Sequence, residues 1–306
     1  MPRIAIIILN WNRPRLSIKT INSILNIRHR HFDYQIFLTD NGSSDNSLKR
    51  FHRTYHKNKK IKIISTGSNL GFVGGNNFAI KLALRQKYDY LLICNNDVLV
   101  DPLFLEKLLL PFKKDRRLAV VGPKIYFAPG FEFHSSRYSK KQLGQVIWSA
   151  GGQMDWDNIL GGNIGVDQVD RGQFDQPQTD IDFLSGCCFL VKSSVVKKIG
   201  LFNPAYFMYL EDVDFCQRAK QAGYKILYQP PAKIWHLNSG SSASGSHLQD
   251  YFIIRNRLYF AKRYANPRAR FALFRQAVKI LFSSNRWKRQ AVIDYYLKRL
   301  GRGSWK

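Results

Sequence analysis

The sequence predicts an α/β fold with a mostly parallel sheet and helices on both of its faces. Two observations lead to this prediction. Apolar segments of strand length alternate with segments of helical periodicity, and the apolar segments are almost continuous, as in strands buried on both faces. Strands are predicted at residues 3–11, 34–40, 61–67 and 88–97. Helices are predicted at residues 13–27, 43–57, 74–87 and 101–114.

The second half of the chain has a different composition. Residues 127–180 are rich in Gly, Gln, Asn and Asp, and their short β-prone segments predict loops and hairpins that line a cleft. A strand and a short helix follow, and two further strands are predicted at residues 224–229 and 232–236. We therefore expect one domain over residues 1–265 and a basic amphipathic helical extension over residues 266–306.

The formal net charge is +27, and much of it lies near the C-terminus. Between Tyr251 and Lys306 there are 15 Lys or Arg residues and one acidic residue, Asp294. The same segment is rich in Phe, Trp, Tyr and Leu, and basic amphipathic helices of this composition bind anionic membrane surfaces. We expect the extension to lie on such a surface. The alternative is a helical appendage that packs on the core with a solvated basic face.

Three further features bear on the location of the protein. No uninterrupted apolar stretch of about 18 residues occurs, so no transmembrane helix is predicted. The apolar N-terminus has the pattern of a strand and is too short for a signal peptide. The four Cys residues lack the spacing of a zinc site, so we expect buried thiols in a reducing compartment. A cytoplasmic protein, peripheral on the inner face of the membrane, fits these features.

Three carboxylates, Glu211, Asp212 and Asp214, begin a helical pattern. The helix dipole stabilises acidic residues in a first turn, so a purely structural role is the simplest interpretation. A second acidic site favours a functional one: the strand at residues 88–97 ends in Asp97, and open α/β sheets bind ligands at the carboxyl ends of their strands. Two such sites can divide the work of a metal-assisted group transfer.

Asp97 is a candidate ligand for Mg²⁺ or Mn²⁺, which commonly bind one or two carboxylates together with substrate phosphates. His236 is a candidate second ligand, and imidazole suits Mn²⁺ better than Mg²⁺, although a lone His is more often structural. Asp212 or Glu211 would then remain as the base that takes a proton from an attacking hydroxyl group.

Two polar loops follow other strands of the predicted sheet. One begins at Asp40, whose carboxylate either accepts a hydrogen bond from a base or ribose or stabilises the turn. The other, residues 67–79, contains four Gly and three Asn before a helix, so its backbone can approach a phosphate or a sugar. It is not a P-loop, and the segment after the first strand lacks the dinucleotide-binding glycines.

Taken together, these segments resemble glycosyltransferase family 2, which has the GT-A fold, a Rossmann-like α/β fold. Within that family the chain is most similar to the rhamnosyltransferase-like bacterial enzymes. The resemblance extends from Ile4 to about Tyr264. It rests on six motifs in the family's order and spacing, at residues 6–14, 39–47, 69–77, 94–98, 185–236 and 255–260.

The resemblance implies a role for each matching position on the donor side. Asp97 matches the metal-binding last residue of the family's Asp-x-Asp motif, and His236 matches a metal ligand of related enzymes. The first position of that motif is Asn95 here, which leaves its contact with ribose or sugar open. The implied cofactor is Mn²⁺ or Mg²⁺. The implied contacts with the donor are Asn10, Asp40, Asn69, Gly71, Asn77, Asn95 and Asn96.

On the acceptor side, Asp212 matches the family's catalytic base, with Glu211 beside it. Gly186 and its strand would lie near the acceptor. The remaining residues assigned to the acceptor or to a diphosphate are Asp214, Arg255 and Arg257. The alternative role of Asp214 is to orient its neighbours. The alternative role of the two Arg residues is to contact phospholipid.

The resemblance implies an inverting, metal-dependent glycosyltransferase of surface polysaccharide synthesis. The expected donor is dTDP-rhamnose, with a UDP-hexose or UDP-galactofuranose second, and the expected acceptor is a saccharide, either free or on a polyprenyl diphosphate. One rival is a basic α/β protein that binds nucleic acid, which explains the charge but not the two acidic sites. The other rival is an inactive scaffold of the same fold, against which Asp97, Asp212 and His236 argue. No nucleic-acid partner is expected, and the oligomeric state is left open.

Overall fold

The structure is a computed structural model and describes residues 1–238 and 246–305. Its strands are β1 (Arg3–Asn10), β2 (Asp33–Asp40), β3 (Ile61–Ser65), β4 (Tyr90–Cys94), β5 (Val98–Val100), β6 (Leu118–Phe127), β7 (Ile147–Ser149), β8 (Gly152–Asp155), β9 (Leu160–Asn163), β10 (Cys188–Lys192) and β11 (Lys225–His236). Its helices are α1 (Pro14–Leu25), α2 (Ser47–Tyr55), α3 (Gly71–Arg85), α4 (Phe104–Lys114), α5 (Ser193–Ile199), α6 (Glu211–Gln221), α7 (His247–Tyr264), α8 (Pro267–Leu281) and α9 (Arg286–Tyr296), with a 3-10 turn at Ser135–Arg137. Within the two described ranges, no helix has the length and apolar character that a bilayer crossing requires. Lys306, the last residue of the predicted extension, lies outside them.

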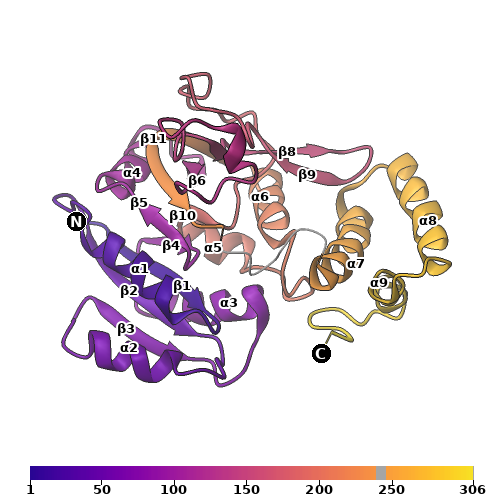
Figure 1. The fold of residues 1–306 in the computed structure, drawn as a ribbon, viewed down its shortest axis with the longest axis horizontal. Coiled ribbons are helices and arrows are strands. Elements are labelled where there is room, and N and C mark those ends of the chain that lie inside the picture. The colour runs from indigo at the N-terminus through magenta and orange to yellow at the C-terminus, as the bar shows by residue number, and fades with distance from the viewer. Residues whose placement is uncertain (239–245, 306) are drawn as a thin grey trace.

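One sheet organises the fold, with the strand order β3-β2-β1-β4-β10-β6-β11-β5 and β7 paired to β6 (Figure 1). Its first four strands are parallel because helices α1, α2 and α3 connect them as crossovers. β10 runs antiparallel between β4 and β6, and β11 is again parallel to β6. The predicted fold class is confirmed, with the parallel part confined largely to the N-terminal half.

Both faces of the sheet are covered, as the continuous apolar strands predict. Along β1, Ile4, Ile6 and Ile8 point into an apolar cluster with α1, α2 and α4. Ala5 and Ile7 point into a second cluster with α3, α5 and α6. This alternation follows from the two-residue repeat of a strand. The parallel pairing of β1 with β2 and β4 brings the carboxyl ends of the three strands to one edge of the sheet.

The second half differs from the prediction in one respect. The two strands predicted at residues 224–229 and 232–236 are the single strand β11, whose pairing with β6 shifts register between Gln229 and Lys233. Two prolines, Pro230 and Pro231, occupy this irregularity. The regular pairing is interrupted there, so the N–H group that proline lacks is not required for a hydrogen bond between the strands. The predicted hairpin region contains β8 and β9, and all four cysteines are free and buried, as predicted.

Helices α7, α8 and α9 lie at the opposite end of the molecule from β2 and β3 (Figure 1). Leu258 of α7 and Leu273 of α8 belong to the apolar cluster that also holds α3 and α6. The C-terminal tail folds back, so that the N–H of Gly301 donates to the carbonyl of Ala205 at 2.8 Å. Within residues 266–305 the structure therefore has the helices α8 and α9 and a non-helical tail, and this tail contacts the core directly at Ala205.

Candidate active site

A tight turn at the carboxyl end of β4 carries the first acidic site. The N–H of Asn95 donates to the carbonyl of Cys187 at 2.8 Å, and the amide of Asn96 donates to the hydroxyl of Ser17 at 2.9 Å. Asp97, which is buried, is the last residue before the short strand β5. The N–H of Val98, on the other side of Asp97, donates to the hydroxyl of Thr20 at 3.1 Å, so the backbone is held on both sides of Asp97.

Asp97 and His236 lie side by side because β5 and β11 are paired neighbours. The Nε2 atom of His236 is 3.2 Å from the Oδ1 atom of Asp97, and Nδ1 of His236 is buried without a hydrogen-bond partner among the described residues. Adjacent ligands of an octahedral Mg²⁺ or Mn²⁺ ion are about 3 Å apart, so this pair fits one ion. In the described part of the chain, no group of three or more His, Cys, Asp or Glu side chains could hold a metal. The other ligands would come from the substrate and water.

The second acidic site is the first turn of α6. Asp212 accepts a hydrogen bond from the N–H of Gly186 at 2.7 Å and one from its neighbour Val213 at 2.8 Å. Burial raises the pKa of Asp212, while these N–H groups oppose the rise. Burial and then the charge of Asp212 raise the pKa of Glu211 well above its usual range. The environment therefore favours the protonated form more strongly at Glu211 than at Asp212, which makes Asp212 the better candidate for the base.

Gly186 and Cys187 hold the two acidic sites together. The N–H of Gly186 binds Asp212, and the carbonyl of the next residue, Cys187, binds the N–H of Asn95. Burial raises the pKa of the Cys187 thiol, and the charges of Asp97 and Asp212 both add to the rise, so this thiol lies within the field of both carboxylates. The sequence placed Gly186 near the acceptor, and the structure places it between the two sites.

Both acidic sites open into one cavity of about 570 Å³. The hairpin β8–β9 and helix α7 form its other walls, together with aromatic side chains that the sequence did not single out. The lining residues include Phe72, Asn95, Asn96, Asp97, Trp148, Leu160, Gly186, Cys187, Tyr209, Glu211, Asp212, Gln249 and Arg257. A cavity of this size accommodates a small-molecule ligand.

The predicted nucleotide contacts at the ends of β1 and β2 form a connected network beside this cavity. The amide of Asn10 donates to Asp40 at 3.0 Å, and the hydroxyl of Ser17 donates to Asn10 at 2.8 Å. Ser17 in turn accepts the hydrogen bond from Asn96. The network thus runs from Asp40 to the turn that carries Asp97, although Asn10 and Asp40 do not themselves line the cavity.

The three donor-side residues predicted around α3 have local partners. Asn69 accepts a hydrogen bond from the N–H of Gly71, which starts the helix with a φ of +72°. A Cβ atom on Gly71 would lie 2.5 Å from the ring of Phe207, so this close approach needs glycine. Both amide atoms of Asn77 bind the backbone of Phe202, which gives Asn77 a structural role outside the cavity.

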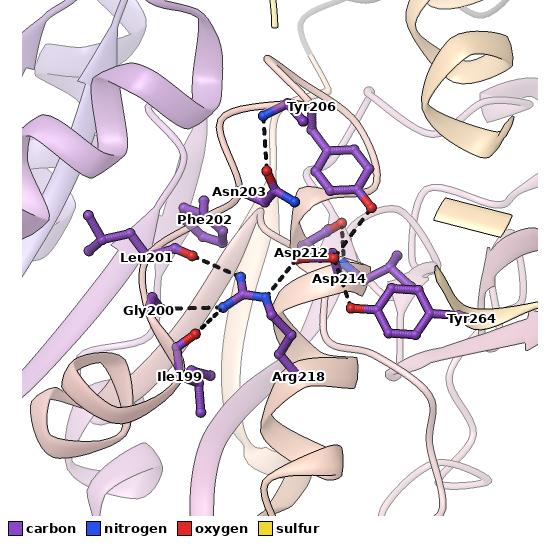
Figure 2. Close-up of polar contacts among 12 residues, drawn as sticks. Ile199, Gly200, Leu201, Phe202, Asn203, Tyr206, Asp212, Asp214, Arg218 and Tyr264 are labelled. Atoms are coloured by element: carbon purple, nitrogen blue, oxygen red, sulfur yellow. Dashed lines mark hydrogen bonds and ion pairs between the residues drawn. The ribbon is translucent and has the colours of Figure 1, made fainter. Parts of the chain in front are cut away.

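Asp214 does not line the cavity. It is fully buried and receives hydrogen bonds from Arg218 at 2.8 Å, Tyr264 at 2.9 Å and Tyr206 at 3.4 Å. Figure 2 shows Arg218 between Asp214 and the backbone carbonyls of residues 199–201. Asp214 therefore anchors the segment that precedes α6, which is the orientation role that the sequence left as an alternative.

The two arginines of α7, Arg255 and Arg257, lie in different environments. Arg255 is fully buried, and its guanidinium donates to the carbonyls of Ala205 and Tyr206, so it is out of reach of a diphosphate or a phospholipid. Arg257 lines the cavity and donates to the carbonyl of Asn158 in the hairpin at 2.9 Å. Among the described residues that line the cavity, Arg257 is the cation.

A strained loop leads into Glu211 and Asp212. Phe207, Tyr209 and Leu210 have φ values of +65°, +67° and +68°, and each such non-glycine residue costs about 1–3 kcal/mol. The amide of Asn256 holds this loop by donating to the carbonyls of residues 206, 208 and 209 at 3.0, 2.7 and 3.0 Å. Sequence reasoning missed Asn256, although it lies in the motif at residues 255–260.

A model of glycosyl transferase family 2 matches residues 5–200. The chain therefore belongs to this family, and it is a glycosyltransferase. Among the relatives that share the greater part of its length are two rhamnosyltransferases. It is 26% identical over 223 residues to the N-acetylglucosaminyl-diphospho-decaprenol L-rhamnosyltransferase of Mycobacterium tuberculosis, over 70% of each chain. It is 24% identical over 225 residues to the rhamnosyltransferase WbbL of Escherichia coli, over 68% of this chain and 80% of the other.

Two solved structures share the fold. One is GalNAc-T7 with UDP, GalNAc and Mn²⁺, with a TM-score of 0.61, 17% identity, and coverage of 90% of this chain and 54% of that one. The other is the mannosyltransferase PcManGT from Pyrobaculum calidifontis with GDP-Man and Mn²⁺, with a TM-score of 0.56, 14% identity, and coverage of 97% and 74%. The resemblance to the rhamnosyltransferase-like branch of family 2 is thus confirmed by the relatives, and the GT-A fold by the structures.

Proposed function

We propose that the protein is an inverting, metal-dependent glycosyltransferase that moves a sugar from a nucleotide-diphosphate donor to a lipid-linked saccharide in surface polysaccharide synthesis. The favoured donor is dTDP-rhamnose, because two relatives are named as rhamnosyltransferases, and a UDP-sugar is second. One observation carries the proposal: Asp97 and Asp212 line one cavity and are joined through Gly186 and Cys187.

On the donor side, Asp97 and His236 would hold Mn²⁺ or Mg²⁺. When bound there, the ion supplies positive charge to the diphosphate that departs. The network from Asp40 through Asn10 and Ser17 to the turn after β4 keeps the donor side rigid. Base, ribose and diphosphate would therefore meet a preformed edge of the sheet.

On the acceptor side, Asp212 would take the proton from the attacking hydroxyl group. Two backbone N–H groups hold its carboxylate, so its orientation does not depend on the substrate. Burial and the charge of Asp212 raise the pKa of Glu211, which disfavours a second negative charge near the reacting carbon. Direct attack by the activated hydroxyl on the face opposite the departing diphosphate gives inversion.

The acceptor would enter between the hairpin β8–β9 and α7. Leu160, Trp148 and Tyr209 offer apolar and aromatic surface to a sugar, and Arg257 offers a positive charge to a diphosphate. The name of the mycobacterial relative specifies a polyprenyl-diphosphate-linked N-acetylglucosamine acceptor for that enzyme. We assign this class of acceptor to the present cavity because it has both kinds of surface.

A thermal-shift panel of nucleotide sugars tests the donor assignment. With Mn²⁺ or Mg²⁺ present, dTDP-rhamnose or a UDP-sugar should raise the melting temperature, since a ligand at 100 times its Kd stabilises a protein by about 2.7 kcal/mol. The stabilisation should disappear with EDTA. If no nucleotide sugar stabilises the protein with either ion, the proposal is wrong, and the protein is better described as an inactive scaffold of the same fold.

A further inference from the structure

Helix α8 has an apolar stripe that no other part of the described chain covers. Its inner side packs through Ala269, Leu273 and Ala277, which are spaced by four residues and buried. Its other side carries four apolar residues at intervals of three or four, the spacing of one helical face, and a fifth follows directly after the helix. These are Phe271, Phe274, Val278, Leu281 and Phe282, which are 62%, 52%, 39%, 40% and 86% exposed.

A row of positive charge runs beside this stripe. Arg268, Arg275 and Lys279 are exposed on α8, next to the apolar residues. The single acidic residue between positions 251 and 306, Asp294, is fully buried and bonded to Tyr251 and to Ser304. No exposed carboxylate in this stretch therefore compensates the cations of α8.

We propose that this outer face of α8 binds an anionic membrane surface, with the five apolar side chains inserted among the lipids and the three cations at the headgroups. The charge favours this partner over a second copy of the chain, because two α8 helices face to face would bring their rows of cations together. The apolar residues favour it over nucleic acid, whose backbone is contacted by charged and polar groups.

The proposal connects this face to the cavity, and in this respect it rests on the proposed function. Arg257 of α7 lines the cavity, and it also lines a small hollow beneath α8 with Leu273 and Ala277. Helix α7, which carries Arg257 into the cavity, is therefore also the helix against which α8 packs. Binding of α8 to lipid would hold the acceptor side of the cavity close to the headgroups, where a polyprenyl diphosphate is found.

Sedimentation of the full chain with vesicles tests the proposal. Wild-type protein should bind vesicles of phosphatidylcholine and phosphatidylglycerol at 0.1 M salt far more strongly than vesicles of phosphatidylcholine alone, where only the apolar side chains contribute. Arg268→Gln with Arg275→Gln and Lys279→Gln should weaken binding by about 100-fold, since each basic residue near an anionic surface contributes about 1 kcal/mol. At 1 M salt, charges more than about 3 Å apart are screened from one another, so the binding that remains comes from the apolar side chains. Phe271→Ser with Phe274→Ser and Phe282→Ser should remove this remaining binding.

Matched controls change other exposed residues of the same kinds. Lys113→Gln with Lys114→Gln and Arg116→Gln removes three exposed cations, and Leu110→Ser with Phe131→Ser removes two exposed apolar side chains. Both controls should bind vesicles like the wild type. Melting temperatures and nucleotide-sugar shifts should be the same for all variants, which separates loss of lipid binding from loss of the donor site.

Three results would overturn the proposal. The first is equal vesicle binding by the wild type and both α8 variants. The second is an equal loss in the controls. The third is light scattering that shows a dimer which the Phe variants dissociate, together with no vesicle binding by the wild type, since α8 would then be a subunit interface. If the wild type binds vesicles but no nucleotide sugar, the membrane proposal stands and the proposed function fails.

Discussion

Replacing Asp212 by Asn should lower turnover by about 10²–10⁴-fold, the usual contribution of a general base, and leave donor affinity unchanged. Asparagine has nearly the same shape and can still accept the hydrogen bond from Gly186, but it cannot take a proton from the acceptor. Steady-state kinetics and calorimetric titration with the donor separate the two quantities. A variant with near-native turnover would show that Asp212 is not the base.

Glu211→Gln is the matched control for that substitution. Because burial and the charge of Asp212 raise the pKa of Glu211, Gln imitates the neutral form that this position favours, and most of the activity should remain. The pH profile gives a second readout. Since burial raises the pKa of Asp212, the base is lost at a higher pH than for an ordinary carboxyl group, and the acid limb of the wild-type profile should lie above 3.8. If Glu211→Gln is inactive and Asp212→Asn is active, the two roles are reversed.

Replacing Asp97 by Ala should reduce donor affinity in the presence of Mn²⁺ on the order of 100-fold, because one of two protein ligands is lost and the charge stabilisation by a metal is worth several kcal/mol. The affinity should fall to the value that the wild type shows in EDTA. Calorimetric titration with the nucleoside diphosphate measures it.

Asp101→Ala is the control for this change. Asp97 precedes strand β5 and Asp101 follows it, but Asp101 does not line the cavity. Its metal-dependent affinity should equal that of the wild type. Metal-dependent binding that survives in Asp97→Ala would place the ion elsewhere.

The core strands and their helices could be predicted from the sequence because their signals are local. Ile4, Ile6 and Ile8 alternate with Ala5 and Ile7 toward two apolar layers, and that pattern is visible without the rest of the chain. The mixed direction of the sheet beyond β4 could not be predicted, because the position of β10 depends on pairing between distant segments.

The acidic positions of the site could be predicted, but not which carboxylate faces the cavity. Asp212 and Asp214 share the first turn of α6, and in the sequence both have the pattern of acidic residues that begin a helix. The signal that separates them is Arg218, four residues after Asp214 and thus able to pair with it on the same side of the helix. That spacing marks Asp214 as a structural anion.

The same limit applies to α7, where Arg255 is buried and Arg257 reaches the cavity. Apolar residues surround this helix on several sides, so no periodicity in the sequence indicates the face that meets the substrate. The link between the acidic sites through Gly186 and Cys187 is likewise tertiary, because backbone groups make it and any residue type carries those groups.

The most direct test of the account is analysis of the product of wild-type enzyme incubated with dTDP-rhamnose, or with a UDP-sugar, and a polyprenyl-diphosphate-linked saccharide. We expect mass spectrometry and NMR to show that the acceptor gains one sugar with inverted anomeric configuration when Mn²⁺ or Mg²⁺ is present, and no sugar in EDTA. A retained configuration would contradict direct displacement with Asp212 as base. Absence of transfer from every nucleotide sugar, together with an electrophoretic shift of nucleic acid, would replace the account with that of a basic binding protein.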